Sequence, residues 1–247
     1  MKKLILIPLF LVIALAMIAP NTYATTIKFA FVFADRFPDE AGPLGFTTGN
    51  VVQVGAMVKA GDSPITKATA TNLDTGLVLN LSSRKIGTIY KDLLFLHRPF
   101  PPFDPNKHKG VWEIRVKDEK GNEAVAKTHR LDKVGKMPYV RNIKASGNTL
   151  APMITWTAPD EKDYPAECKI KYRVRLLKRV DSQFYKSKKG LSDTKEQIPE
   201  GFLKPEDIPD TYVRIETQCW DTDDTDQPVP VELKSETFRP LKEALGQ

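Results

Sequence analysis

Two segments in the second half of the chain alternate strictly between apolar and polar residues: CKIKYRVRLL (168–177) and TYVRIETQCW (211–220). In the first, lysine or arginine occupies every second position, and aliphatic or aromatic residues lie between them. A period of two with one apolar side is typical of a half-buried antiparallel β-strand. We therefore expect two amphipathic strands whose basic residues lie on a solvated sheet face.

The remainder of the chain after residue 25 shows the same pattern of short strands. In the first half we expect strands at 26–34, 50–60, 65–73, 77–81 and 90–96, followed by a hairpin over 110–131. In the second half we expect seven strands, at 140–145, 151–157, 168–177, 184–188, 194–198, 211–220 and 229–238, a spacing typical of a β-sandwich. No segment longer than about two turns has a helical period with caps. The pattern predicts an all-β fold.

The hairpin carries a resemblance to a known class of domain. Trp112, Ile114 and Val116 alternate with charged residues, and the turn reads Asp-x-x-Gly-Asn from Asp118 to Asn122. With its inward tryptophan, it resembles the closing strand pair of bacterial immunoglobulin-like domains. The resemblance implies a fold for the first half and carries no function.

The second half resembles a fibronectin type III domain through its whole length. The segment ITWTAP (154–159) is similar to that family's second strand with its core tryptophan, and YRVRL (172–176) is similar to its third. The family's corner tyrosine would fall at Thr211, which is a departure from the pattern. The resemblances imply two tandem immunoglobulin-like β-sandwiches, at 25–134 and 135–247, joined by a short linker over 132–138.

The first 24 residues have the pattern of a secretory signal peptide. Lys2 and Lys3 precede an uncharged apolar run over 4–19, and a polar stretch ends at Ala24, after which we expect cleavage. No later apolar run is long enough to span a bilayer. We therefore expect a periplasmic or secreted protein.

Charge and cysteine content narrow the picture further. The formal net charge is +6, and removal of Lys2 and Lys3 with the leader would lower it to +4. Because the basic residues alternate with apolar ones along strands rather than forming runs, we do not expect nucleic-acid binding. In an exported protein two cysteines favour one disulfide, with two buried free thiols as the alternative. If their strands are antiparallel neighbours, Cys168 faces Cys219.

A proline-rich stretch, HRPFPPFDPNKHK (97–109), is the candidate binding loop. Proline stiffens a backbone and lowers the entropy cost of ordering it, and exposed aromatic rings can stack on sugars or fill a partner's pocket. We take His97, Arg98, Phe100 and Phe103 as its candidate contacts. The alternative is a structural connection whose phenylalanines pack against the sandwiches.

Other chemistry is weakly represented. The three histidines have no metal-ligand spacing, and no nucleophile motif, phosphate loop or CxxC motif occurs. An acidic run could hold calcium weakly through Asp221, Asp223, Asp224 and Asp226, although a solvated turn is the simpler interpretation. We expect no cofactor and no catalytic residues.

These patterns predict a non-catalytic, exported binding or scaffolding protein of the bacterial cell envelope or exterior. Its partner would be an unidentified protein or polysaccharide of the envelope. Two alternatives remain open: a periplasmic assembly chaperone built from two sandwiches, which would lend a strand to a subunit, and an accessory protein of carbohydrate-degrading machinery.

Overall fold

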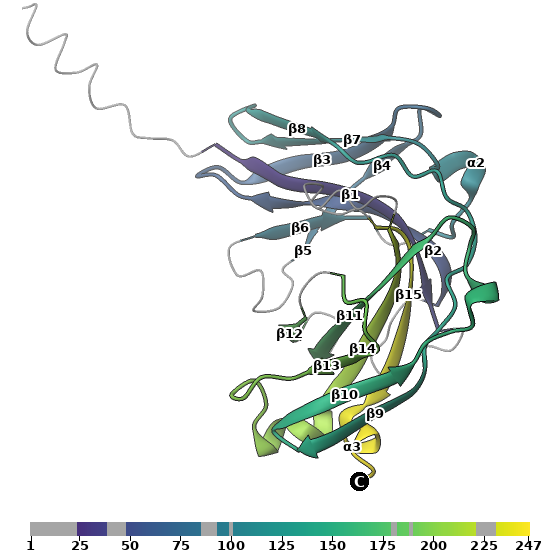
Figure 1. Cartoon of the computed structure of the whole chain (residues 1–247). Coiled ribbons are helices and arrows are strands. Elements are labelled where there is room, and N and C mark those ends of the chain that lie inside the picture. Colours follow the sequence, from purple (N-terminus) through teal and green to yellow (C-terminus); the bar gives the residue numbers. More distant parts are fainter. Residues whose placement is uncertain are drawn as a thin grey trace, which may run out of the picture.

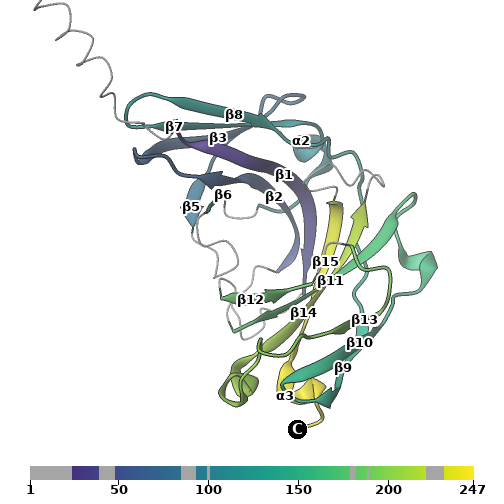
Figure 2. The same cartoon turned by 60° about the vertical axis from the view of Figure 1, so that its left-hand side comes forward.

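The computed structural model describes residues 24–38, 48–84, 93–98, 101–178, 182–187, 190–220 and 231–247. These residues form three β-sheets, shown in Figures 1 and 2. Two helices of four residues each, α2 (Pro105–His108) and α3 (Leu241–Ala244), and two 3-10 turns, η1 (Glu161–Asp163) and η2 (Pro205–Asp210), complete the described elements. Residues 1–23 of the leader, residues 39–47, Phe100 and the acidic run 221–226 lie outside the described residues. The all-β prediction is confirmed.

The first half of the chain forms a sandwich around one core. Its four-stranded sheet has the order β4 (Val78–Asn80), β3 (Ile65–Asn72), β7 (Trp112–Asp118) and β8 (Glu123–Lys127). It faces strands β1 (Thr26–Phe37), β2 (Gly49–Lys59), β6 (Leu94–His97) and β5 (Ser82–Arg84). The expected hairpin is confirmed, because Trp112, Ile114 and Val116 are fully buried in the core between the two sheets.

The second half forms another sandwich with its own core. A three-stranded sheet, with the order β13 (Lys195–Gln197), β10 (Ala151–Thr157) and β9 (Arg141–Asn148), faces three strands of the other sheet. Those strands are β12 (Gln183–Lys186), β11 (Lys169–Leu177) and β14 (Tyr212–Trp220). Trp156 lies in this core with its ring edge-on to Tyr172 at a centroid distance of 5.5 Å. Seven strands, including β15 (Val231–Pro240), therefore occur where the alternation predicted them.

The two sandwiches share one sheet, which the sequence pattern did not predict. The eight-stranded sheet, called the long sheet below, has the order β12-β11-β14-β15-β1-β2-β6-β5. Its central joint is the parallel pairing of β1, the first strand, with β15, the last. Figures 1 and 2 show the long sheet bending between the two smaller sheets. The two sandwiches are therefore connected by the pairing of β1 with β15 as well as by the chain segment that runs between them.

The long sheet has one apolar face and one polar face. The apolar face carries both sandwich cores and, at the joint, a small junction core of Ala34, Met137, Cys219 and Leu233. The opposite face, called the inner face below, receives the alternate residues of the same strands. Among these are Asp35 on β1, Glu216 on β14 and Lys234 on β15, all of them buried.

Candidate functional site

The predicted binding loop is anchored to the first sandwich. The Phe103 N–H donates to the Asn50 carbonyl at 3.0 Å, and the Val52 N–H donates to the Pro101 carbonyl at 3.0 Å. The half-buried ring of Phe103 packs against both the first core and the junction core. This arrangement matches the structural alternative for Phe103, while a binding role for the loop remains a prediction.

Two other predicted loop residues lie on β6 and just after it. His97 is buried, its ring lies 4.7 Å from the Phe95 ring, and its Nδ1 is 2.9 Å from the Arg98 carbonyl. The Arg98 side chain is half-buried. Phe100, the remaining predicted contact, lies outside the described residues. The structure therefore places His97 and Phe103 in packed surroundings rather than on a free loop tip.

A second histidine of the same loop has a structural role. His108, at the end of α2, is buried, and its Nδ1 accepts a hydrogen bond from the Asp104 N–H at 2.9 Å. Burial lowers the pKa of His108, with the nearby Asp104 opposing this shift. The Trp112 indole N–H donates to the His108 carbonyl at 3.1 Å. The His108 ring thus holds the start of α2 through Asp104, and the His108 carbonyl bonds the loop to the buried Trp112.

Metal and membrane chemistry find no support within the described residues. There, no group of three or more histidine, cysteine or acidic side chains is placed to hold a metal ion. The candidate calcium ligands Asp221, Asp223, Asp224 and Asp226 fall outside that part of the chain, so their role stays a prediction. No described helix has the length and apolar character needed to cross a bilayer.

The inner face carries an array of acidic and basic side chains across four neighbouring strands. The Glu216 carboxylate is its centre, 2.7 Å from Arg175 Nε and 2.6 Å from an Arg214 guanidinium nitrogen. Lys234 Nζ lies 2.8 Å from Asp35 Oδ2 and 2.6 Å from Glu236 Oε1. The members, called the charge array below, are Asp35, Arg173, Arg175, Arg214, Glu216, Lys234 and Glu236.

The expectation of a solvated basic face was therefore wrong for the centre of the long sheet. The side chains of Arg173 and Arg175 are 11% exposed, and that of Glu216 is 1% exposed. The physical reason is cross-strand pairing, because β11 and β14 align Arg173 with Glu216 and so match opposite charges. A signal for this was present in the sequence, since the polar positions of 213–218 and 232–236 alternate in sign rather than being uniformly basic.

The array moves the ionisation of its two central carboxylates in opposite directions. Burial opposes the charged form of Glu216, but Arg175, Lys234 and the other nearby cations outweigh it and hold its pKa well below the usual range. For Asp35, burial is the largest effect, and the Glu236 charge adds to it. Lys234 offsets these only in part, so the pKa of Asp35 is raised well above its usual range.

Amide and indole groups extend the array at its two ends. Gln53 on β2 donates to Asp35 Oδ2, while Asp35 Oδ1 has no hydrogen-bond partner among the described residues. At the other end, Gln218 Nε2 donates to Glu216 Oε2 at 2.6 Å, and Trp220 Nε1 donates to Gln218 Oε1 at 3.1 Å. The array thus spans both sandwiches, with hydrogen-bonding partners on β2 and β14.

An aromatic cluster lies beside the array on the first-sandwich part of the inner face. Phe31 stacks on Phe33 at 5.6 Å and on Phe95 at 5.4 Å between ring centroids. Strand β2 lies between β1 and β6 and places Gly55 opposite both Phe31 and His97. Because glycine has no side chain, it leaves space where the rings of the two flanking strands meet. Lys234 Nζ lies 4.7 Å from the Phe33 ring centroid and links the cluster to the charges.

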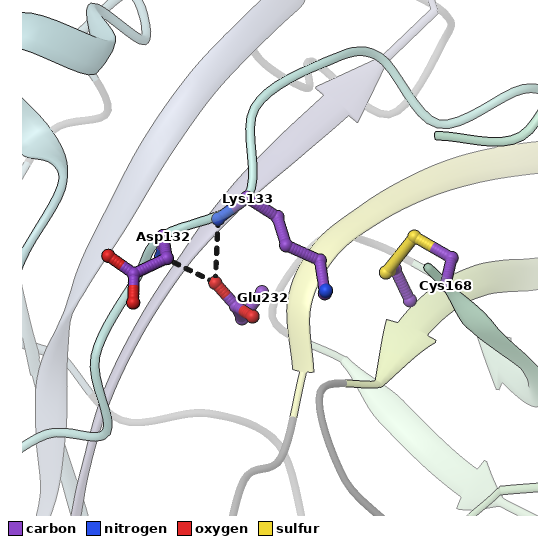
Figure 3. Close-up of a disulfide and its surroundings, with 5 residues drawn as sticks. Asp132, Lys133, Cys168 and Glu232 are labelled. Carbon is purple, nitrogen blue, oxygen red and sulfur yellow. Dashed lines mark hydrogen bonds between the residues drawn. A yellow bond between two sulfur atoms is a disulfide. The ribbon is translucent and has the colours of Figure 1, made fainter. Parts of the chain in front are cut away.

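The connection between the sandwiches is bound to the joint at several points. We call residues 132–139 the strap. Figure 3 shows the Glu232 carboxylate accepting hydrogen bonds from the backbone N–H groups of Asp132, at 2.6 Å, and Lys133, at 2.9 Å. Ser235 Oγ donates to the Pro138 carbonyl at 2.7 Å. The start and the end of the strap are therefore both held by β15.

The strap also contacts β1 and the junction core. An Arg36 guanidinium nitrogen donates to the Met137 carbonyl at 3.2 Å, and the Tyr139 hydroxyl donates to the Phe37 carbonyl at 2.5 Å. The Met137 side chain is 1% exposed and packs with Ala34, Cys219 and Leu233. The segment expected to be a linker is thus fixed to both strands of the joint.

The predicted disulfide is confirmed, and it lies at the same joint. Cys168, just before β11, is bonded to Cys219 near the end of β14, with Cα atoms 4.9 Å apart and a sequence separation of 51. Cys219 is fully buried in the junction core, and Cys168 packs against that core. The bond therefore ties the second sandwich together beside its joint with the first (Figure 3).

Comparison with known proteins adds little to this geometry. No protein-family model matches the chain, and no curated protein matches it in sequence. Among solved structures, the crystal structure of murine CEACAM1b is 11% identical, with 86% of this chain and 98% of that chain covered at a TM-score of 0.24. So low a score carries no argument about function. The chain is described by its fold, which consists of two β-sandwiches that share one sheet, with one intramolecular disulfide.

Proposed function

We propose that the protein is an exported, non-catalytic binding or scaffolding protein of the bacterial cell envelope or exterior. The observation that carries this proposal is the long sheet, which runs through both sandwiches and holds them in one arrangement. A rigid pair of sandwiches can present two binding surfaces at a constant separation. The signal-like leader and the disulfide support export, since disulfides persist in oxidising compartments.

The domain families belong to the same proposal. A fibronectin type III-like second half is supported by the buried Trp156, while Thr211, at the place of the family's corner tyrosine, departs from the pattern. The Thr211 hydroxyl donates to the Asp207 carbonyl at 2.7 Å, so a side-chain bond to the upstream backbone is present despite the substitution. A bacterial immunoglobulin-like first half is supported by the hairpin turn, where the Asp118 carboxylate accepts from the Asn122 N–H at 2.9 Å.

The charge array favours a structural role over a catalytic one. Its carboxylates are directed at cations of neighbouring strands rather than at solvent, and Glu216 is 1% exposed. A general acid or base must reach a substrate proton within hydrogen-bond distance. Side chains that are buried and paired with one another are poorly placed for this task.

A binding screen tests the proposal. Oxidised, mature protein is immobilised and exposed to envelope extracts, and the retained polysaccharides and proteins are identified. We expect one class of envelope component to be retained by the wild type and released by Arg98→Ala and Phe100→Ala, which alter the predicted loop. Val78→Ala, at a 56% exposed position of β4, is the control and should bind as the wild type does.

Two results would contradict the proposal. Retention of no component by folded protein would remove the binding role, and cleavage of a retained polysaccharide, seen as new reducing ends, would make the protein an enzyme. Phe103→Ala is unsuitable as a probe, because its ring packs in two cores and its loss would disturb folding as well as binding.

The periplasmic-chaperone alternative rests on strand β8. In the described part of the chain it pairs with β7 alone, and Val125 is 48% exposed, so an edge is open to another strand. A donor strand, however, needs a row of large apolar residues, and alanines occupy positions 124 and 126. Co-purification with a β-rich subunit, abolished by Val125→Pro, would favour this alternative. The accessory role in carbohydrate degradation is tested by the polysaccharide arm of the same screen.

A further inference from the structure

The joint between the two sandwiches depends on a very short strand pairing. β1 and β15 are aligned in parallel through three residue pairs, Ala34 with Leu233, Asp35 with Lys234 and Arg36 with Ser235. By contrast, β1 is aligned with β2 over nearly its whole length, and β15 is aligned in the same way with β14. Each strand is therefore firmly held within its own sandwich, and the register of β1 on β15 decides how the sandwiches are positioned.

The middle pair of this joint is an ion pair within a row of buried charges. Lys234 Nζ lies 2.8 Å from Asp35 Oδ2, and the side chains are 7% and 0% exposed. Two residues after Lys234, on the same face, lies Glu236, which is 1% exposed. Glu232, two residues before Lys234, lies at an irregularity in the pairing of β15 with β14, and its carboxylate is bonded to the strap. The last strand thus presents one buried cation followed by one buried acid to the single aspartate of the first.

Every small shift of this register meets a physical penalty. A shift of one residue would align Asp35 with Leu233 or Ser235 and turn its carboxylate toward the junction core. A shift of two residues in one direction would keep the face but align Asp35 with Glu236. In the other direction it would align Asp35 with Glu232, whose carboxylate is directed at the strap. In a displaced register Asp35 would lose its contact with the Lys234 ammonium, and when ionised it would face another buried acid, which is destabilising. Within this range, the observed register alone pairs Asp35 with an opposite charge.

We propose that Lys234 and Glu236 set the register between the first and last strands, because Lys234 attracts Asp35 in the observed alignment and Glu236 opposes its displacement. They thereby set the relative position of the two sandwiches. The other polar groups that face Asp35 are Gln53, Glu216 and Arg214, which lie on the neighbouring strands β2 and β14. The inference goes beyond the proposed binding function and does not depend on it.

The strap is the competing explanation for the same register. It bonds to both strands, through Glu232 and Ser235 on β15 and through Arg36 and Phe37 on β1. These contacts favour the native alignment, but they impose no repulsion on a displaced one. Variants of Asp35 leave the strap contacts in place and therefore separate the two explanations.

Spin labels on the two sandwiches measure the register directly. One label is placed at Val78 on β4 and one at Lys144 on β9, both exposed, with the native disulfide intact. Distances are measured by pulsed electron paramagnetic resonance before and after unfolding and refolding in denaturant. Since a strand rises about 3.3 Å per residue, a two-residue slip displaces the sandwiches by about 6.6 Å along the strand direction.

Three substitutions and one control decide the question. We expect a single distance for the wild type and for Asp35→Glu, which keeps the charge. In Asp35→Lys, a second population displaced by about 6.6 Å along the strand should appear, because Glu236 then becomes the favourable partner and Lys234 a repelling one. In Asp35→Asn, which removes the charge without changing the shape, the refolded distribution should broaden. Asp193→Asn, at an exposed position, is the control and should match the wild type.

The Asp35→Asn result keeps the proposal testable if Asp35→Lys does not fold. A refolded Asp35→Asn protein with the single wild-type distance would show that the strap and backbone set the register by themselves, and would overturn the proposal. A folded Asp35→Lys protein with that same single distance would overturn it as well.

Discussion

At the scale of single residues, the centre of the molecule is Glu216, whose carboxylate collects the guanidinium and ammonium groups of three neighbouring strands. A buried ion is costly unless it is paired, so the array is stable as a set and sensitive to the loss of one member. Its two central carboxylates differ in ionisation, because cations surround Glu216 while acids approach Asp35. The pairing leads to a prediction about stability, and the difference in ionisation leads to predictions about pH.

The first prediction concerns the loss of the central acid. Glu216→Gln leaves Arg175 buried without its counter-ion and Arg214 with Glu236 as its remaining partner, and we expect the free energy of unfolding to fall by about 3–5 kcal/mol, the range for breaking a buried ion pair. Urea denaturation followed by tryptophan fluorescence measures this value. Asp160→Asn is the matched control, because its partner Arg141 is 57% exposed and the loss should not exceed about 1 kcal/mol. Equal losses in the two variants would contradict a buried, mutually dependent array.

The second prediction concerns pH. Because the pKa of Asp35 is raised in the folded state, that state holds the proton more tightly than the unfolded chain does. The stability that Asp35 contributes relative to Asp35→Asn should therefore be greatest in acid and should decline as the pH rises from 3.8 through the raised pKa. Chemical denaturation across this range measures it. A difference that grows with rising pH would mean that Asp35 is stabilised as the carboxylate.

Glu216 should have the opposite pH dependence. Its pKa is lowered in the folded state, so its stabilisation is present above the usual value of 4.5 and is lost as the pH falls below that value through the lowered pKa. Comparison of the wild type with Glu216→Gln in the same series isolates this contribution. The two carboxylates, although close together, are thus expected to give slopes of opposite sign.

At the scale of elements, the long sheet depends on the match between neighbouring strands. Strand β2 lies between β1 and β6 and carries Gly55 where the rings of Phe31, Phe95 and His97 gather. A glycine inside a strand normally weakens it. Here it leaves room for the aromatic rings of the flanking strands to stack, and it lets the Leu96 carbonyl approach closely.

The third prediction tests this glycine. In Gly55→Ala, the new methyl group would fall on the Leu96 carbonyl oxygen and lie 3.0 Å from the Phe31 ring, so β6 must move away. We expect a loss of about 1–3 kcal/mol, as for other overpacked sites, measured by thermal and urea denaturation. Adding Phe31→Leu should not restore the stability, because the closest obstacle is backbone. Full recovery in the double variant would assign the strain to the ring instead.

At the scale of the whole molecule, the two sandwiches form one unit through the β1–β15 joint, the strap and the junction core. The disulfide lies at this point, so a bond within the second sandwich also supports its contact with the first. The joint pairs the first strand along the chain, β1, with the last, β15. The long sheet can therefore form in full only when nearly the whole chain is present.

The fourth prediction follows from this arrangement. Trp112 reports on the first sandwich and Trp156 on the second, so the double variants Trp156→Phe/Trp220→Phe and Trp112→Phe/Trp220→Phe let each half be followed separately. We expect both to unfold at the same urea concentration. Removal of the disulfide by Cys168→Ala/Cys219→Ala should lower both midpoints together, with a loss of about 4 kcal/mol for a loop of this length. Two separated transitions would show that the halves are independent domains.

Much of the fold follows from local pattern. The alternation of apolar and polar residues placed the strands, turn residues such as Gly121 placed the hairpin, and the matching cysteine positions placed the disulfide. Such features are local because side chains alternate faces in every strand, whatever the partner. The candidate site was less accessible, since the proline-rich loop proved to be partly packed and the charge array was taken for a solvated face.

The sequence by itself determined where the chain forms strands, which side of each strand is apolar, and which two sulfur atoms bond. The tertiary structure alone decided that β1 lies beside β15, that the two sandwiches share one sheet, and that Asp35 meets Lys234. The physical reason is that strand pairing joins residues about two hundred positions apart. A periodicity of two records which side of a strand is buried, but it contains no information about the strand that will lie next to it.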